Sequence, residues 1–206
     1  MEIYFVRHGQ TGGNVAKRHQ SEESHLTPLG KKQAQRAAAK IQKLQPTHIL
    51  VSDRVRAIET AQFVAQTSDI IPSVSYLFSE LCRPSTLYGF HHRSLSSIWY
   101  IYRWYLGQVG EESCSSKGES YQHFYNRVKS AQAMLETLPE DARVVVVSHS
   151  IFINFFVAHI NSTKPMGFIR AFLIFTKILR IKNGSLTKLT FTKDTATPWK
   201  VLSYSQ

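Results

Sequence analysis

Short apolar runs alternate with longer patterned stretches along the first 160 residues. The runs have the length and composition of strands in a mostly buried parallel sheet, and they lie at 3–6, 48–51, 73–77 and 143–147. In the stretches between and after them, the spacing of apolar residues predicts helices at 28–44, 55–65, 119–138 and 151–160.

Local signals indicate where several of these elements begin and end. Thr27 followed by Pro28 is typical of a helix start. Ser52 or Asp53 is expected to cap the next helix, whose predicted apolar stripe is Val55, Ile58, Ala61 and Ala65. Near the end of the sequence, Asn183-Gly184 stands between two β-rich runs and predicts a type I′ hairpin.

The order of elements predicts the fold class. Strands alternate with helices to residue 160, so we expect an α/β sandwich with a mostly parallel sheet, closed on one side by the antiparallel hairpin. Residues 81–118 break the alternation with Pro84 and an aromatic run at 99–105. We interpret them as a partly helical insertion over the sheet edge. No repeat or linker is visible, and residues 1–206 are therefore expected to form one domain.

Composition excludes a disordered chain, because 43% of the residues are hydrophobic and only 19% are charged. The formal net charge is +11, an excess that attracts anions such as phosphate esters, nucleic acid or acidic lipid without choosing among them.

Compartment and membrane association are inferred from three features. The two cysteines, Cys82 and Cys114, allow one bridge, but reduced thiols in the cytoplasm are the expectation. The first residues lack the basic and apolar regions of a signal peptide. The apolar stretch 166–181 is too short and too charged to span a bilayer. We therefore expect a cytoplasmic protein with no membrane partner.

Polar residues follow three of the predicted strands. The first strand ends in Arg7-His8-Gly9, the second is followed by Ser52-Asp53 and then Arg56, and the valine strand ends in Ser148-His149. In open α/β sheets, ligands bind beyond the carboxyl ends of the strands. Two arginines and two histidines are thus expected at one edge of the sheet.

This residue set suits a phosphate monoester. Arginine forks match phosphate oxygens and neutralise charge as it redistributes in the transition state. Arg7 and Arg56 would also lower the pKa of a neighbouring histidine, and a neutral imidazole can attack phosphorus while the second histidine donates hydrogen bonds. Gly9 would let the backbone approach the ligand. Glu80, in an apolar setting, is the candidate acid for the leaving oxygen, with Asp53 as runner-up.

Together these segments resemble the histidine phosphatase superfamily, which includes the cofactor-dependent phosphoglycerate mutases. The matching pieces are Arg7-His8-Gly9-Gln10-Thr11 with Asn14, Leu26-Thr27-Pro28-Leu29-Gly30, Ser52-Asp53 with Arg56-Ala57, Glu80, and Ser148-His149. The resemblance implies a three-layer α/β/α sandwich that uses no metal and no cofactor. It implies that His8 becomes phosphorylated, that Glu80 supplies the proton, and that the phosphoryl group and substrate are held by Arg7, Arg56, His149, Asn14, Gly9 and Thr11.

Three departures from the family pattern bear on the activity. Ser150 and Ile151 follow His149 where the family often has two small residues, and Arg54 replaces a usually apolar residue. After Glu80, the sequence Leu-Cys-Arg-Pro differs from the run with which phosphoglycerate mutases hold a diphosphorylated cofactor. This last departure favours a phosphatase over a mutase.

Three functions remain open at this point. The leading hypothesis is a phosphomonoesterase that acts through a phosphohistidine on His8. A mutase is the second, with Arg83, Arg93 or Arg103 holding a second phosphate. The third is a non-catalytic basic module that binds RNA or a phosphoprotein. The expected partner is a phosphorylated small molecule or a phosphoprotein, with no nucleic acid. The aromatic run at 99–105 could stack on nucleotide bases, but it is expected to pack the insertion against the body of the protein or else to form a homodimer surface. His91-His92 form no recognisable metal motif.

Overall fold

The computed structural model describes residues 1–110, 117–177 and 181–206. In these residues a sheet of six strands has the order β3-β2-β4-β1-β5-β6. The strands are β1 (Glu2–Arg7), β2 (His48–Val51), β3 (Ser73–Val74), β4 (Arg143–Ser148), β5 (Leu186–Phe191) and β6 (Trp199–Ser203). The first four pair in parallel, while β5 and β6 are antiparallel to their neighbours. The predicted fold class is confirmed, including the C-terminal hairpin.

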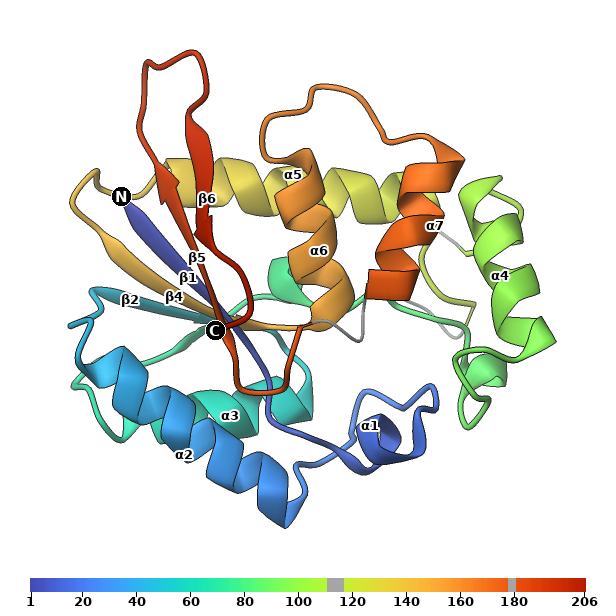
Figure 1. Cartoon of the computed structure of the whole chain (residues 1–206), viewed down its shortest axis with the longest axis horizontal. Coiled ribbons are helices and arrows are strands. Elements are labelled where there is room, and N and C mark those ends of the chain that lie inside the picture. The colour runs from blue at the N-terminus through green and yellow to red at the C-terminus, as the bar shows by residue number, and fades with distance from the viewer. Residues whose placement is uncertain (111–116, 178–180) are drawn as a thin grey trace.

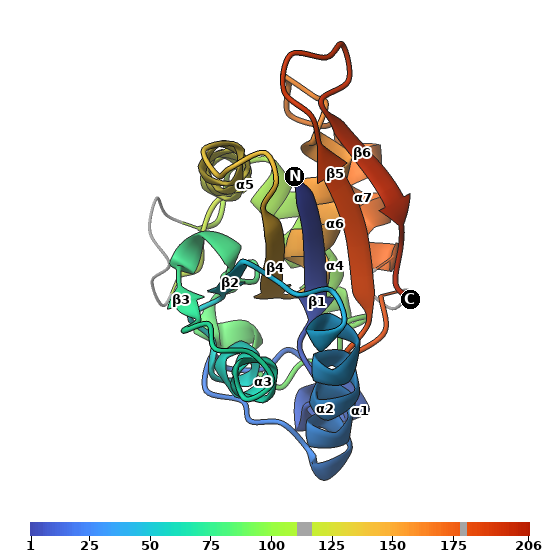
Figure 2. The ribbon, with the colours of Figure 1, turned by 90° about the vertical axis from the view of Figure 1, so that its left-hand side faces the viewer.

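Helices cover both faces of the sheet (Figures 1 and 2). The α-helices are α1 (Gly12–Ala16), α2 (Pro28–Gln42), α3 (Val55–Ala65), α4 (Leu95–Tyr105), α5 (Tyr121–Glu136), α6 (Ser150–His159) and α7 (Phe168–Lys177). Short 3-10 turns lie at Tyr76–Phe78 and Ser85–Leu87. Helices α2 and α3 pack with small residues against one face, and α5 and α6 pack with aromatic residues against the other.

The order of the central strands positions the candidate site. Strand β4 lies between β1 and β2, and all three run in the same direction. The register pairs Arg7 with Ser148, and the backbone N–H of His8 donates to the carbonyl of Ser148 at 3.0 Å. Consequently His8 and His149 emerge side by side at the carboxyl edge.

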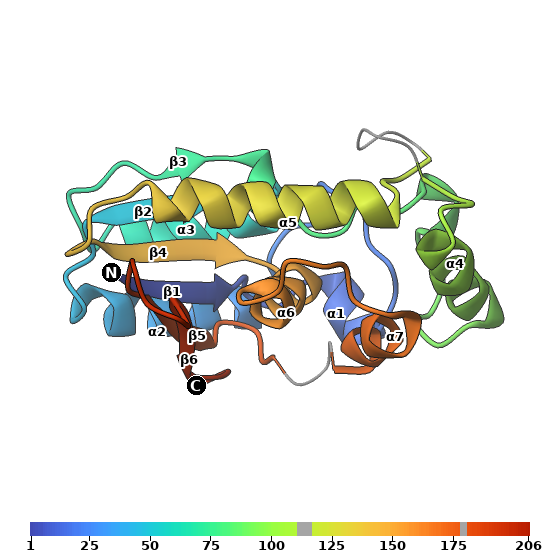
Figure 3. The ribbon, with the colours of Figure 1, turned by 90° about the horizontal axis from the view of Figure 1, so that it is seen from above.

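The insertion lies beyond the carboxyl ends of the strands rather than over the sheet edge (Figure 3). Its main helix, α4, buries Trp104 and Tyr100. Trp104 meets Tyr121 and Phe155 with ring centroids 5.1 and 6.0 Å apart. The expectation of an edge position was wrong because these rings anchor the insertion to α5 and α6, at the end of the sheet.

The segment before β5 also differs from the prediction. Helix α7 lies in the part of the sequence before Asn183, where a β-rich run was expected, and its Ala171 and Ile174 face the core at helical spacing. The hairpin turn lies between β5 and β6, not at Asn183-Gly184. Gly184 has φ +73°, so the dipeptide does form a turn, but this turn leads into β5. The backbone N–H of Gly184 donates to the carbonyl of Arg7 at 2.9 Å.

Helix α3 begins and faces the core differently than expected. Its N-cap is Arg54, with no side-chain cap, rather than Ser52 or Asp53. Its buried face includes Arg56 and Thr60 beside small apolar residues. Of the predicted stripe, Ala61 is buried, whereas Val55, Ile58 and Ala65 are only half-buried. The buried face instead carries the polar side chains of Arg56 and Thr60. The strand expected at 73–77 is reduced to β3.

Cys82 is disulfide-bonded, so the expectation of a reduced thiol is wrong for this residue. Cys114 lies outside the described residues. Among the helices that are described, none combines the length and apolar character that crossing a bilayer would require.

Candidate active site

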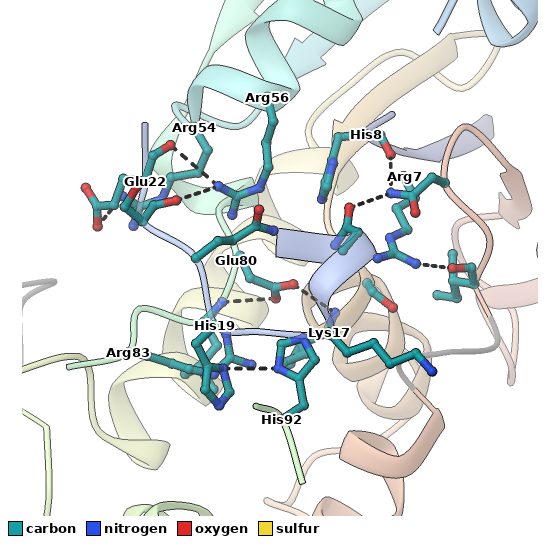
Figure 4. A pocket seen from close by; sticks show the side chains of 18 of the residues that line it. Arg7, His8, Lys17, His19, Glu22, Arg54, Arg56, Glu80, Arg83 and His92 are labelled. Atoms are coloured by element: carbon teal, nitrogen blue, oxygen red, sulfur yellow. Dashed lines mark hydrogen bonds and ion pairs between the residues drawn. The ribbon is translucent and has the colours of Figure 1, made fainter. Parts of the chain in front are cut away.

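A cavity of about 410 Å³ opens at the carboxyl ends of the strands (Figure 4). Five residues proposed from the sequence line it: Arg7, His8, Asn14, Arg56 and Glu80. His149 lies directly behind, because its ring centroid is 5.0 Å from that of His8. We refer to Arg7, His8, Arg56 and His149 as the inner cluster.

His8 is held as a neutral ring with a defined free nitrogen. Its Nδ1 lies 2.7 Å from the carbonyl oxygen of Gly9, which can only accept, so Nδ1 carries the proton. Burial, together with the charges of Arg56 and Arg7, holds the pKa of His8 well below its usual value. In this state Nε2 keeps its lone pair, which is what a nucleophile requires.

His149 has one ring nitrogen fixed and one without a partner. Its Nε2 lies 2.7 Å from the hydroxyl of Ser52. Its Nδ1 is buried and has no hydrogen-bond partner in the described part of the chain. Burial and then Arg56 hold the pKa of His149 well below its usual value. Buried polar atoms are normally satisfied, so this nitrogen is a candidate contact for a bound ligand.

The two arginines of the inner cluster are buried without a carboxylate bound to either guanidinium among the described residues. Arg7 donates from NH1 to the carbonyl of Ile181, and Arg56 donates from NH1 to that of Ser21 at 3.1 Å. In both, the Nε–H is buried and has no partner within the part of the chain that the structure describes. Burial lowers the pKa of each to about 10, which leaves both charged at neutral pH. A dianionic group would satisfy both.

Glu80 lines the same cavity, and its carboxyl group lies against the first turn of α6. Its carboxyl oxygens accept from the backbone N–H groups of Ile151 and Phe152 at 3.2 and 3.1 Å. The carbonyl of Glu80 accepts from buried Arg127 at 3.3 Å, and Arg127 is in turn paired with Glu119 at 2.5 Å. The carboxyl is thus held in place from both sides.

The remaining predicted residues have mainly structural contacts. A Cβ on Gly9 would lie 2.3 Å from the carbonyl oxygen of Gly30, so this glycine permits close packing of two backbones. Thr11 is fully buried and caps α1. Asn14 completes that cap, and its Oδ1 also accepts from the side chain of Asn183 at 3.1 Å. Gly9 and Thr11 do not line the cavity, whereas Asn14 does.

A second group of basic residues lines the cavity away from the inner cluster. In Figure 4, Lys17, His19, Arg83 and His92 lie together, with Glu80 between them and the inner cluster. We call these four residues the outer cluster. The Nδ1 atoms of His19 and His92 are 3.3 Å apart. Burial, with Arg83 as the next cause, lowers the pKa of His92 to about 4 and that of His19 to about 2.

Sequence reasoning missed most of the outer cluster and the loop at Lys182 and Asn183, which also lines the cavity. Asn183 donates to the carbonyl of His8 at 3.0 Å. The only signal was the Asn-Gly pair itself, which we interpreted as a hairpin. Within the described residues there is no cluster of three or more His, Cys, Asp or Glu that could hold a metal ion.

The chain resembles known proteins over its whole length. The model of the histidine phosphatase superfamily (branch 1) matches residues 3–203. Probable phosphoglycerate mutase GpmB of Enterobacter sp. (strain 638) is 30% identical over 200 residues, which cover 97% of this chain and 87% of that protein. The protein of the same name from Proteus mirabilis (strain HI4320) is 28% identical over 204 residues, with the same coverage.

Solved structures share the fold. The α-ribazole phosphatase of Shigella flexneri aligns with a TM-score of 0.76 at 18% identity, covering 100% of this chain and 96% of that one. A mycobacterial glucosyl-3-phosphoglycerate phosphatase with VO3 aligns with a TM-score of 0.73 at 23% identity, covering 99% and 98%. At these identities the likeness establishes the architecture.

Proposed function

The chain belongs to the histidine phosphatase superfamily, branch 1, and on that premise we propose that it hydrolyses a phosphate monoester through a phosphohistidine on His8. One observation carries the proposal. The three residues that neighbour a neutral histidine each have a buried nitrogen with no partner among the described residues: Nε of Arg7, Nε of Arg56 and Nδ1 of His149. Such a set is costly unless an anion fills it.

In the first step, Nε2 of His8 attacks phosphorus and the ester P–O bond breaks. Arg7 and Arg56 stabilise the non-bridging oxygens, and His149 donates from Nδ1. Glu80 gives its proton to the leaving oxygen, which departs as an alcohol. The product of this step is a phosphoryl group on His8 and a Glu80 carboxylate.

In the second step, water attacks phosphorus and the P–N bond breaks. Glu80 takes the proton of the attacking water, so inorganic phosphate is released and both residues return to their starting forms. The carbonyl of Gly9 holds Nδ1–H of His8 throughout, which keeps the ring in one orientation.

Replacing the nucleophile tests the proposal. His8→Ala is expected to lower the rate of phosphate release from p-nitrophenyl phosphate by more than about 10⁴-fold. Labelled substrate should give an acid-labile, base-stable phosphoprotein in the wild type and none in the variant. Full turnover in His8→Ala would refute the mechanism. Salt-sensitive RNA binding without any esterase activity would favour the non-catalytic alternative.

A mutase is the second candidate, and the outer cluster is the observation that favours it. Of the three arginines considered for a second phosphate, Arg83 lines the cavity, while Arg93 and Arg103 are not among its lining residues. Lys17 and Lys182 add charge there. Isomerisation of a phosphoglycerate that depends on a diphosphorylated primer would decide for this activity, and its absence beside phosphate release would decide for the phosphatase.

A further inference from the structure

Two neighbouring helices expose large apolar side chains on one part of the surface. We define the α4/α7 face by Leu95, Ile98, Trp99, Tyr102, Leu106 and Ile169. Leu95 is 85% exposed and Ile169 is 75% exposed. The two helices lie together at one end of the molecule in Figures 1 and 3. Large exposed apolar side chains that gather on two neighbouring helices are typical of an interaction surface.

The exposed stripe is not needed for the packing of α4. The helix already buries Tyr100 and Trp104 against the core. Its exposed apolar residues recur at helical spacing on the opposite side, so both sides of the helix are apolar. The rings of Trp99 and Tyr102 stack with their centroids 5.5 Å apart, and the ring centroid of Tyr102 lies 5.9 Å from that of Phe168 in α7. These ring contacts join the two helices into one surface.

The charged residues of the two helices have a single sign: α4 carries Arg103, and α7 carries Arg170 and Lys177. Among the described residues, Arg103 follows Tyr102 on α4 and exposed Arg170 follows Ile169 on α7. Two copies of the face would bring these cations together, which opposes self-association. An anionic surface would complement them.

We propose that the α4/α7 face binds the surface of an anionic lipid bilayer. Tryptophan and tyrosine are favoured at the level of lipid headgroups, and the apolar side of an amphipathic helix enters the boundary of the acyl chains while basic residues contact the headgroups. Since no described helix can cross a bilayer, the binding is in the plane of the interface. This proposal stands on surface residues alone and does not depend on the reaction at His8.

Vesicle sedimentation tests the proposal. The chain is mixed with vesicles of phosphatidylcholine alone or of phosphatidylcholine with one-quarter phosphatidylglycerol, at low and high NaCl. We expect binding to the anionic vesicles, weakened at least tenfold by high salt. Trp99→Glu/Ile169→Glu should lower the binding at least tenfold, and Arg103→Gln/Arg170→Gln should reduce its dependence on salt.

A charge-matched variant is the control. Ile71→Glu/Val74→Glu places the same two charges on exposed apolar residues near β3, where Ile71 is 90% exposed, and it should change binding less than twofold. No binding to anionic vesicles, equal binding to neutral ones, or equal loss in the control would overturn the proposal. So would a dimer, seen by light scattering, that Trp99→Glu/Ile169→Glu dissociates. Circular dichroism confirms that each variant is folded.

Discussion

The inner and outer clusters face the same cavity but are positioned in different ways. His8 and His149 follow adjacent parallel strands, in a register fixed by backbone hydrogen bonds. The outer cluster joins two irregular segments, the one after α1 and the insertion. These meet at the bridge of Arg18 with His91 and through backbone hydrogen bonds from His92 to Lys17 at 3.0 Å, from His19 to Phe90 at 2.9 Å and from Gly89 to His19 at 2.9 Å.

This structural difference suits the two clusters to different tasks, the inner one to catalysis and the outer one to the choice of substrate. A reacting histidine must be held in one geometry, and a sheet provides that rigidity. A segment outside the sheet can change without moving the strands, so it is suited to contacts with the variable part of a substrate. The inner cluster should therefore control kcat, and the outer cluster should control which substrates bind.

After the loss of His8 itself, removing an arginine of the inner cluster should have the largest effect. Arg56→Met is expected to lower kcat for p-nitrophenyl phosphate by about 10³-fold, because a buried charge no longer meets the transition state. Its melting temperature should stay or rise, since Arg56 is a buried charge whose Nε–H has no partner among the described residues. Steady-state kinetics and calorimetry measure both. Retained activity with a large loss of stability would assign Arg56 a structural role instead.

The next largest effect is expected on stability, where the backbones at Gly9 and Gly30 pack closely beside the inner cluster. Gly9→Ala would place a Cβ 2.3 Å from the carbonyl oxygen of Gly30, and we expect it to lower the free energy of unfolding by about 3 kcal/mol. Gly12→Ala is the matched control, because a Cβ there meets nothing within 4 Å. Urea denaturation of both variants measures the difference. Equal stability of the two would show that the backbones at residues 9 and 30 separate easily.

A smaller effect is expected in the outer cluster. Arg83→Ala should raise KM about tenfold for a phosphate ester that carries a second anionic group, and leave kcat nearly unchanged, because the lost contact binds ground state and transition state alike. For p-nitrophenyl phosphate, which lacks that group, both constants should stay within twofold. A fall in kcat for both substrates would place Arg83 in the chemistry and remove the distinction between the clusters.

The sequence predicts the inner cluster because its geometry follows from chain order. Once parallel strands are inferred, Arg7, His8 and His149 must end at one edge. The outer cluster depends on the pairing of segments about 70 residues apart, such as Arg18 with His91, which no local pattern encodes. The sequence therefore gives no role to Lys17, and it indicates Arg83 only as one of three arginines that could hold a second phosphate.

Helix α7 shows a second limit of sequence reasoning. Its aromatic and β-branched residues favour a strand by propensity, but packing of Ala171 and Ile174 against the core selects a helix. The Asn183-Gly184 pair was correctly interpreted as a turn and wrongly assigned to a hairpin, because the pair fixes local backbone angles and not the partner strand.

Acidification should lower the stability of the folded protein by a modest amount through His92 of the outer cluster. His92 has a folded pKa of about 4 against about 6.5 when unfolded, so the unfolded chain binds a proton first. Its contribution to stability is complete above pH 6.5 and is lost as the pH falls toward 4. When the pH falls from 7 to 5, the free energy of unfolding should fall in both proteins, and the fall should be about 1 kcal/mol smaller in His92→Gln than in the wild type, allowing for the partial exposure of His92. Thermal unfolding at both values measures this; identical pH dependence would contradict it.

The contacts of Arg127 have a consequence for protein engineering. Its guanidinium donates to Glu119 and to the carbonyls of Ser79 and Glu80, while Glu119 also accepts from the backbone N–H of Cys82 at 3.1 Å. Both ends of the insertion are thereby tied to the strand-end loop. A chimaera that exchanges the insertion for another should place its junctions between residues 82 and 119. Cys82 and Glu119 then remain, and their hydrogen bonds hold both ends of the grafted segment against the rest of the protein.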